Sequence, residues 1–455
     1  MKLDDQLLKP SDLPGFPDAL DALDVTLALY NAVSMGKTLH GDWKTIWDKH
    51  RADSEHQEYI SPGALRKIDK AIRNLSYIGD LSSIDIRKKS KVCIFLGAGA
   101  STPTPSSIPT VAQLLPELWR RARKLGREDI DRLSRWCEEK NVTNIEDLLT
   151  AAYLANFSAK NPAVSGLLNY FLFNYRGEEA KSSISLRPQR QPQPSPVDAS
   201  SVAMFQETLQ GLFGLLTSTM IPAPPNNGHK AITKFVKNHA DTSIVTTNYD
   251  GCMDESLLDA KVPINTHIGS TDNKERNIDL VKIHGSINWT YCDSCHEVKE
   301  FDLLSLKQDF KSDRISYAVV GICKSCGGQR RPLLIPPIGL KFVMFPNLIR
   351  LWNIARERIE GADLLIVVGF SFSEADSYIN KIVERSMSMN SNQRIIVCDP
   401  NRKLSESLRE RYAARISGFQ VERIIEAVGS AEVLLPELFE KLSTLMTGDG
   451  AKVSA

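Results

Sequence analysis

Four continuous runs of apolar residues constrain the fold of this chain more than any other feature. They occupy residues 92–96, 243–247, 364–368 and 394–398, and polar residues or glycine follow each of them. A strand that is apolar along its whole length is typical of a parallel sheet with both faces covered, because a sheet with one wet face gives alternation instead. The runs therefore predict a doubly wound, Rossmann-like α/β fold.

The segments outside these runs predict the domain organisation. Residues 1–90 are expected to be an N-terminal helical region, since apolar residues recur there three and four positions apart, and residues 91–446 the main α/β domain. Residues 111–240 separate the first two runs by far more chain than one crossover helix needs, which predicts a helical insertion. Within it, residues 177–200 lack core-forming side chains and are expected to be a mobile loop, and residues 447–455 a disordered tail.

A helix start is predicted inside the insertion. Thr143 stands three residues before Glu146, which is the spacing of a capping box, and the apolar residues Leu148 and Leu149 follow. We therefore expect a helix that begins after Thr143.

Composition excludes several classes of protein. The formal net charge is +1, so no overall field would attract nucleic acid or an anionic membrane, and direct nucleic acid binding is not expected. The apolar runs are much shorter than the ~20 residues that a membrane helix requires. The chain does not start with basic residues followed by an apolar core, so we expect a cytoplasmic protein.

Four of the eight cysteines form two closely spaced pairs. Cys292 and Cys295 are separated by two residues, as are Cys323 and Cys326, and 27 residues lie between the pairs. In a reducing cytoplasm this spacing favours a metal over disulfides. We predict a zinc module at residues 291–330 in which four thiolates leave no open position, so that the zinc is structural. The alternative is four unrelated reduced cysteines.

Short polar segments follow the first two apolar runs. Gly97, Ala98 and Gly99 come directly after the first run, and Ser101 follows. Two glycines at this place let backbone amides approach a pyrophosphate, although such a glycine also serves as a plain tight turn. The second run leads into a Thr-Asn-Tyr-Asp segment centred on Asn248. Open α/β sheets bind ligands at the carboxyl ends of their strands, although Asn and Asp also terminate strands in turns.

His284 stands in a Lys-Ile-His-Gly-Ser segment. An isolated histidine is usually structural. Taken in order, however, the segments resemble the sirtuins: the glycine turn with Ser101, the Thr-x-Asn-x-Asp segment, the His-Gly pair and the four-cysteine module. The segment at residues 365–372 resembles the strand that leads to the sirtuin Gly-Thr-Ser contact, and residues 429–436 resemble the terminal segment beside adenine. The resemblance covers residues 91–446.

The resemblance implies that NAD⁺ is the substrate and that Asn248 and His284 are the catalytic residues. Asp399 occupies the place of the sirtuin ribose contact after the next strand. The residues expected to bind NAD⁺ are Gly97, Ala98, Gly99, Ser101, Thr247, Asp250, Gly369, Ser371 and Asp399.

Three departures from the sirtuin pattern bear on the reaction. Ser107 replaces a usual glycine, residues 110–112 replace Asp-Phe-Arg, and residues 332–341 contain prolines where deacylases have the strand that clamps an acyl-lysine peptide. In these respects the chain resembles the sirtuin-like domains of bacterial antiviral defence systems, which hydrolyse NAD⁺ to nicotinamide and ADP-ribose. An NAD⁺-dependent protein deacylase and a non-catalytic sensor of NAD⁺ or ADP-ribose are the alternatives. Because such a toxic reaction must be restrained in a living cell, we expect a homo-oligomer or a partner, and the resemblance suggests a HerA-type ring ATPase as one candidate partner.

Overall fold

The computed structural model describes most of the chain. The described residues are 7–8, 22–34, 38–39, 43–55, 60–73, 77–87, 89–139, 141–151, 199–268, 277–292, 294–311, 322–328, 330–335, 345, 348–373 and 376–447. The predicted mobile loop at 177–200 lies outside them, except that its last two residues begin a helix. Most of the predicted tail, residues 448–455, also lies outside them.

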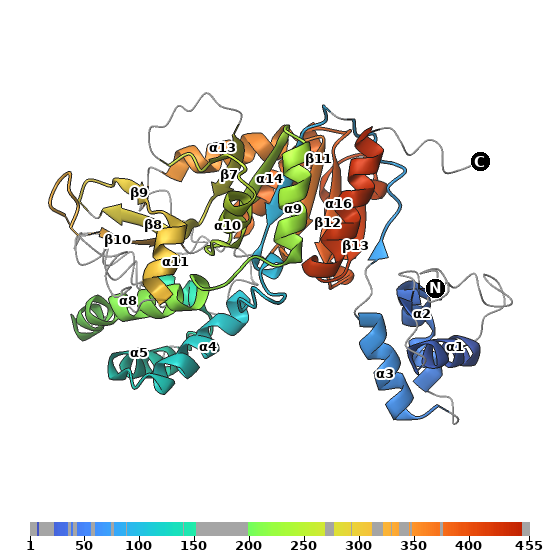
Figure 1. Cartoon of the computed structure of the whole chain (residues 1–455), viewed down its shortest axis with the longest axis horizontal. Coiled ribbons are helices and arrows are strands. Elements are labelled where there is room, and N and C mark those ends of the chain that lie inside the picture. Colours follow the sequence, from blue (N-terminus) through green and yellow to red (C-terminus); the bar gives the residue numbers. More distant parts are fainter. Residues whose placement is uncertain are drawn as a thin grey trace, which may run out of the picture.

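An eight-stranded sheet organises the molecule (Figure 1). Its strand order is β3-β13-β12-β11-β4-β5-β7-β6, and all neighbours run parallel except the antiparallel pair β3 and β13. The strands are β3 (Tyr77–Ile78), β4 (Val92–Leu96), β5 (Thr242–Thr246), β6 (Ile264–Asn265), β7 (Ile278–Lys282), β11 (Leu364–Val368), β12 (Arg394–Asp399) and β13 (Ile424–Val428). The doubly wound parallel sheet predicted from the four apolar runs is confirmed; β5 is shifted by one residue and β12 ends one residue later.

Helices cover both faces of this sheet, which explains why its strands are apolar throughout. Ile94 of β4 contributes to a core with α9 (Asn227–Asn238), α10 (Cys252–Asp259) and α16 (Ala431–Thr447). The next residue, Phe95, points to the other face and a core with α13, α14 and α15. These three helices span Leu348–Glu360, Ser377–Met389 and Lys403–Arg415.

The part of the chain that connects β4 to β5 forms further helices, which pack beside the sheet. They are α4 (Val111–Lys124), α5 (Glu128–Glu139), a helical segment at residues 145–151 and α8 (Ala199–Met220). Their apolar residues join the core on the face of the sheet that carries Phe95. Although α9 falls inside the range 111–240 that we assigned to the insertion, it packs against α16 in the helical layer of the sheet. The described part of the insertion therefore ends with α8.

The cysteine pairs lie in a second, three-stranded antiparallel sheet of order β10-β8-β9. It consists of β8 (Gly285–Cys292), β9 (Val298–Glu300) and β10 (Arg330–Leu334), and α11 (Leu303–Lys311) follows β9. The register of β10 on β8 shifts between Pro332 and Leu333. Such an irregularity accommodates a proline, because proline cannot donate a ladder hydrogen bond.

The N-terminal region is helical and has a core of its own. It comprises α1 (Ala22–Ser34), α2 (Trp43–Glu55) and α3 (Pro62–Arg73), and a short parallel pair joins β1 (Leu7–Leu8) to β2 (Thr38–Leu39). Apolar side chains such as Leu29, Trp47 and Ile68 form a separate buried cluster. Figure 1 shows these helices gathered apart from the eight-stranded sheet.

Candidate functional site

The candidate site begins at the centre of the sheet, where β4 and β11 pair although far apart in sequence. The chain leaves them toward opposite sides, because β5 neighbours β4 and β12 neighbours β11. In open α/β sheets ligands bind at such a switch point, beyond the carboxyl ends of the strands. The two turns that follow β4 and β11 are therefore the expected floor of a ligand site.

Glycines let these two turns touch. The Gly99 amide donates to the Gly369 carbonyl over 2.9 Å. A Cβ added at Gly97 would lie 2.5 Å from the Gly369 oxygen, and one at Gly99 would lie 2.7 Å from the Gly369 Cα atom. Gly369 itself has a φ of +60°, a conformation that glycine adopts without strain. Backbone packing alone therefore requires glycine at positions 97 and 99.

Asn248 is held against the glycine turn. Its side-chain nitrogen donates to the Gly97 carbonyl over 3.0 Å and to Ser101 Oγ over 3.4 Å, and its own amide donates to Thr246 Oγ1. These bonds fix the orientation of the side-chain amide at the carboxyl end of β5. The polar segments that follow β4 and β5 therefore lie in contact with each other.

A buried histidine that the sequence did not reveal lies behind Ser101. His229 is 2 % exposed, and its Nε2 lies 3.3 Å from Ser101 Oγ while its Nδ1 accepts from the amide of Asn226. Burial lowers the pKa of His229, although the carboxylates of Asp250 and Asp254 oppose the shift. A neutral ring that accepts at Nδ1 carries its proton on Nε2 and donates it to Ser101. Asn226 caps α9 with its side chain, a cap pattern visible in sequence, but the contact with Ser101 is not.

His284 follows β7 and is held in place from several sides. It is 3 % exposed, its ring lies between Tyr249 and Trp352 with centroid distances of 6.4 and 5.9 Å, and its carbonyl accepts from the Ile335 amide. The next residue, Gly285, has a φ of +84°, and a Cβ there would collide with the carbonyl oxygen of the opposing strand. The glycine after His284 is therefore needed for β10 to pack against β8.

One cavity of about 510 Å³ joins these segments. His284 lines it from β7, Asn248 from β5, and Gly99 and Gly369 from the crossing turns. Ile108 and Pro109 of the loop before α4 line it as well. Nine of the eleven predicted catalytic and NAD⁺-binding residues line the cavity, namely Ala98, Gly99, Thr247, Asn248, Asp250, His284, Gly369, Ser371 and Asp399.

The two other predicted residues, Gly97 and Ser101, sit directly behind the cavity and contact Asn248. The structure therefore brings the predicted set together, while the binding and catalytic roles of its members remain predictions. Phe370, which interrupts the family pattern between Gly369 and Ser371, packs edge-on against Phe95 with ring centroids 4.8 Å apart.

Two acidic residues of the cavity were not predicted as site residues. Asp376 precedes α14, and its Oδ1 lies 4.0 Å from His284 Nε2. Glu146 lines the cavity from the helical segment of the insertion. Burial, with the nearby charges of Asp376 and Asp147, raises the pKa of Glu146 to about 7. Burial also raises the pKa of Asp399 at the end of β12, while the Asn401 amide opposes the shift.

The expected capping box at Thr143 and Glu146 is wrong by one residue. Asn144 Oδ1 accepts the Asp147 amide over 2.9 Å, and Asn144 Nδ2 donates to the Asp147 carboxylate over 2.8 Å. Asn144 is a better cap than threonine because its short amide can both accept and donate. The shift leaves Glu146 on the cavity side of the helix start.

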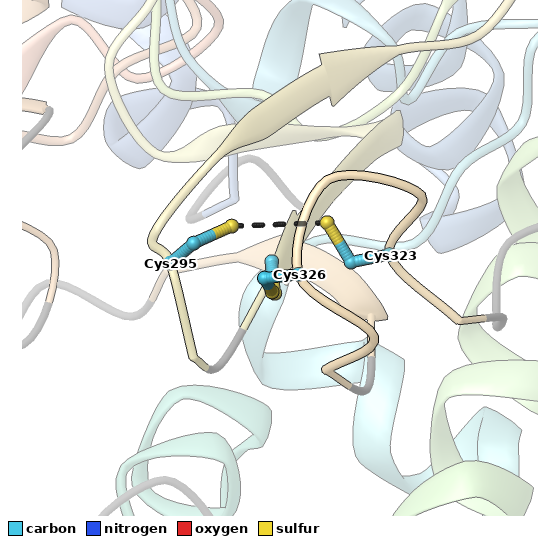
Figure 2. A group of neighbouring side chains, drawn as sticks. Cys295, Cys323 and Cys326 are labelled. Atoms are coloured by element: carbon cyan, nitrogen blue, oxygen red, sulfur yellow. Dashed lines mark hydrogen bonds between the residues drawn. The ribbon is translucent and has the colours of Figure 1, made fainter.

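The four predicted cysteine ligands converge. Their sulfur atoms all lie within 4.8 Å of one another, with 3.5 Å between Cys292 and Cys326 and 3.7 Å between Cys295 and Cys323. Figure 2 shows Cys295 and Cys323 pointing toward each other. Two sulfurs of a tetrahedral zinc site with Zn–S bonds of ~2.3 Å lie ~3.8 Å apart, whereas a disulfide requires ~2.05 Å.

Hydrogen bonds to the sulfurs fit thiolate ligands as well. The Ser294 amide donates to Cys292 Sγ and the Gly328 amide to Cys326 Sγ. The Arg330 guanidinium lies 3.2 Å from Cys323 Sγ. The residues present therefore suit a closed four-sulfur metal site.

Among the described residues, no helix combines the length and apolar character needed to cross a lipid bilayer.

Comparisons with known proteins agree with the sequence resemblance. Residues 242–421 match the family model for the SIR2-like domain. The chain is 29% identical to a NAD-dependent protein deacetylase of Staphylococcus aureus over 147 residues, which are 32% of this chain and 46% of that protein. It is 27% identical to NAD-dependent protein deacylase 2 of Pseudomonas aeruginosa over 158 residues, 35% of this chain and 50% of that protein.

The matches to these curated relatives span about half of their length. A solved complex of a Sir2 homologue mutant with ADP-ribose aligns with 82% of this chain and 100% of its own at 16% identity and a TM-score of 0.41. A Sir2 homologue bound to NAD aligns with 79% of this chain and 92% of its own at 17% identity and a TM-score of 0.39. Residues 242–421 thus match a SIR2-like domain, and the family model and the curated relatives together support the resemblance of this chain to the sirtuins.

Proposed function

We propose that the chain hydrolyses NAD⁺ to nicotinamide and ADP-ribose. One observation carries the proposal: His284 and Asn248, from two different strands, line the same cavity as the crossing glycine turns after β4 and β11. A dinucleotide bound at these turns would place its nicotinamide ribose within reach of both side chains. The names of the curated relatives, which are NAD-dependent enzymes, support NAD⁺ as the ligand.

This reaction requires few catalytic groups from the protein. When the bond between nicotinamide and ribose breaks, its electron pair neutralises the pyridinium ring, so the leaving group needs no proton, unlike the oxygen of an ordinary glycoside. Water then adds to the ribose carbon and loses a proton. The protein has to orient the two reactants and accept that proton.

His284 and Asn248 suit these two tasks. A neutral imidazole carries one nitrogen without a hydrogen, and that nitrogen can accept a proton. Because the Asn248 nitrogen donates to Gly97, its carbonyl oxygen is the atom of that amide that would accept a hydrogen from water or a ribose hydroxyl. We assign Asn248 to positioning and His284 to proton acceptance.

The remaining predicted residues are assigned to binding. The amides of the turn at Gly97, Ala98 and Gly99 would face the pyrophosphate, because backbone there can approach closely. Ser371 and Asp399, at the ends of β11 and β12, would contact the far half of the dinucleotide.

We assign a structural zinc ion to Cys292, Cys295, Cys323 and Cys326. Four sulfur ligands close the coordination sphere, so the metal would hold the two loops of the small sheet together and take no part in the reaction. The hydrogen bonds from backbone amides to two of the sulfurs support this assignment.

The test is incubation of the purified protein with NAD⁺ alone. We expect release of nicotinamide and ADP-ribose, and loss of that release in His284→Ala and Asn248→Ala proteins that keep the wild-type circular dichroism spectrum. Full activity in both variants would contradict the assignment. Met389→Ala serves as a control, since Met389 is an exposed residue at the end of α14.

A protein deacylase is the second candidate, because curated relatives carry that name. It predicts that nicotinamide is released only when an acetylated peptide is added. Pro332 lies within β10, the edge strand that would receive such a peptide, and it lacks an amide hydrogen for pairing. Calorimetry that detects NAD⁺ binding without turnover would instead support a sensor.

We further propose that the activity is restrained in the cell, since depletion of NAD⁺ is toxic, and that the chain acts as a regulated effector in antiviral defence. Self-association, or a partner such as a HerA-type ring ATPase, would provide the restraint. The N-terminal helices and the insertion are the candidate contact surfaces. Size-exclusion chromatography that finds a constitutively active monomer would contradict this part of the proposal.

A further inference from the structure

Glu146 reaches the cavity from outside the sheet. It belongs to the helical segment at 145–151, in the part of the chain between β4 and β5. Asn144 and Asp147 satisfy the start of that segment by hydrogen-bonding each other, so Glu146 is not used as a cap. Glu146 is instead one of the residues that line the cavity, together with Asn144 and Ile145. The insertion thus supplies an acidic side chain to the cavity.

Glu146 and His284 line the same cavity. Asp376, whose charge acts on Glu146, lies 4.0 Å from His284 Nε2. Asp376 thus links the two residues, because it lies beside His284 and its charge acts on Glu146. Asp399 lies after β12, beyond β11 from the strands that carry Asn248 and His284. The two acidic parts of the cavity would serve different halves of a dinucleotide.

We propose that Glu146 is a specificity-determining residue whose carboxylate selects the cationic nicotinamide ring of NAD⁺ over the neutral ring of NADH. The inference rests on the proposed function, because it takes the cavity to bind a nicotinamide dinucleotide with the reacting ribose near His284. It adds a role for the insertion that the resemblance to sirtuins does not supply.

The charge that Glu146 would recognise persists through the reaction. In bound NAD⁺ the positive charge sits on the pyridinium ring. As the bond from the ribose carbon to the ring nitrogen breaks, the electron pair stays with nicotinamide and the positive charge passes to the ribose carbon and ring oxygen. Water then supplies the new bond to carbon, and its proton goes to His284. A fixed carboxylate beside this path stabilises the charge at each stage without forming a bond itself.

The ionisation of Glu146 supports this role. Its carboxyl group shares the region with Asp376 and Asp147, and burial together with these charges raises its pKa to about 7. A cation placed beside it favours the ionised form, so binding of the cation should release a proton near neutral pH. The other titratable groups that line the cavity are Tyr249, Asp250, His284 and Asp399.

The experiment compares two dinucleotides that cannot be hydrolysed by this route. Carba-NAD⁺ keeps the pyridinium charge and lacks the ribose ring oxygen, and NADH has a neutral ring. Calorimetry on the full chain measures both dissociation constants in wild type, Glu146→Gln and the matched control Glu139→Gln, whose side chain is exposed on α5. We expect Glu146→Gln to weaken carba-NAD⁺ binding roughly tenfold while NADH binding stays unchanged, and Glu139→Gln to change neither.

A measurement without substitution complements this comparison. In wild type, the affinity for carba-NAD⁺ should rise as pH increases through about 7, and the affinity for NADH should not. An unchanged preference for carba-NAD⁺ in Glu146→Gln, or parallel pH profiles for the two ligands, overturns the inference and leaves the proposed hydrolysis standing. Preference for carba-NAD⁺ that depends on Glu146, in a protein that releases no nicotinamide from NAD⁺, would uphold the inference and remove the hydrolase assignment.

Discussion

At the scale of single residues, the site depends on a crossing of two glycine turns. Gly97 and Gly99 follow β4, Gly369 follows β11, and their backbones touch. The same contact fixes the carbonyl of Gly97 that orients Asn248. A side chain at the crossing would therefore disturb both the stability of the sheet centre and the geometry of the proposed reaction centre.

We predict that Gly97→Ala destabilises the protein by about 1–3 kcal/mol, because the new Cβ would lie 2.5 Å from the Gly369 oxygen and 2.7 Å from the Phe370 Cα atom. Urea unfolding followed by circular dichroism measures the change. Gly214→Ala is the matched control. Nothing lies within 4 Å of a Cβ at Gly214 in α8, so this variant should gain roughly 0.5–1 kcal/mol. Equal free energies of unfolding for Gly97→Ala and Gly214→Ala would contradict the close contact between the two glycine turns.

Glu146 should make stability depend on pH. The pKa of Glu146 rises from 4.5 to about 7 on folding, so the unfolded chain releases this proton at a lower pH than the folded protein does. Between pH 4.5 and 7 the folded state binds more protons, and stability contributed by Glu146 falls as pH rises. We predict that Glu146→Gln removes this loss, which is at most roughly 3 kcal/mol at pH 8.

The measurement is urea unfolding of both proteins from pH 4 to pH 8. The difference in unfolding free energy between variant and wild type should grow in favour of the variant across this range. Glu139→Gln, an exposed change on α5, should give a flat difference. A flat difference for Glu146→Gln as well would show that its carboxyl group ionises as freely in the folded protein as in the unfolded one.

The residues found from sequence share one property: each directly follows an apolar run or belongs to a short motif. Asn248 and His284 could be predicted because the carboxyl ends of parallel strands meet at one edge. His229 could not, because its partner Ser101 lies 128 positions away and the contact arises only when α9 packs beside the glycine turn. Asp376 likewise reaches His284 only through the packing of α14.

At the scale of elements, burial on both faces is what makes the central strands visible. Val92, Ile94 and Leu96 enter one core while Cys93 and Phe95 enter the other, so every position of β4 is apolar. β8 is also buried at every position, but it was not among the predicted strands. Its polar residues are satisfied by tertiary contacts, as where Asn288 donates to the Phe301 carbonyl, and such compensation leaves no periodic signal.

The helix in the insertion shows how a small error of register changes a functional interpretation. Thr143 with Glu146, and Asn144 with Asp147, both have the spacing of a capping pair, and sequence alone does not choose between them. The structure selects the second pair. The choice matters because the Glu146 side chain then lines the cavity and does not cap the helix.

The small sheet depends on its cysteine cluster. We predict that the purified protein contains one zinc ion per chain, because the four sulfurs have the spacing of a tetrahedral site. Cys323→Ser should lose the metal, and so should treatment with a strong chelator, with a lower melting temperature in both cases. Elemental analysis and thermal unfolding measure these changes.

Cys137→Ala provides the control for that prediction. Cys137 is buried in α5, outside the cluster, and burial raises the pKa of its thiol to about 12. This variant should lose some stability through a smaller side chain but keep its zinc. Zinc content that is equal in Cys137→Ala and Cys323→Ser would remove the assignment of the four-cysteine site.

At the scale of the whole molecule, the described residues form three apolar cores in two parts of the chain. Helices α1, α2 and α3 enclose one cluster of apolar side chains, and the two faces of the eight-stranded sheet enclose the others. The segment that follows the N-terminal helices also pairs with the sheet, because β3 adds an antiparallel edge strand to β13. The candidate cavity lies beyond the carboxyl ends of the central strands β11 and β4, away from that edge.

This arrangement predicts the outcome of two truncations. A protein that begins at residue 77 keeps β3 and should fold, bind zinc and retain the cavity, because the removed helices bury their apolar residues mainly against one another. A protein that begins at residue 89 also loses β3, and with it the pairing of Tyr77 and Ile78 to β13 and the hydrogen bond from the Gly79 amide to the Glu426 carbonyl. The second truncation should therefore melt several degrees below the first, since a loss of about 1 kcal/mol lowers the melting temperature of a large domain by ~2–4 °C.

Differential scanning calorimetry of both proteins, with nicotinamide release measured in parallel, makes the comparison. If the protein starting at residue 77 failed to fold while the full chain did, the N-terminal helices would be part of the sheet's own core and the division into two units would be wrong.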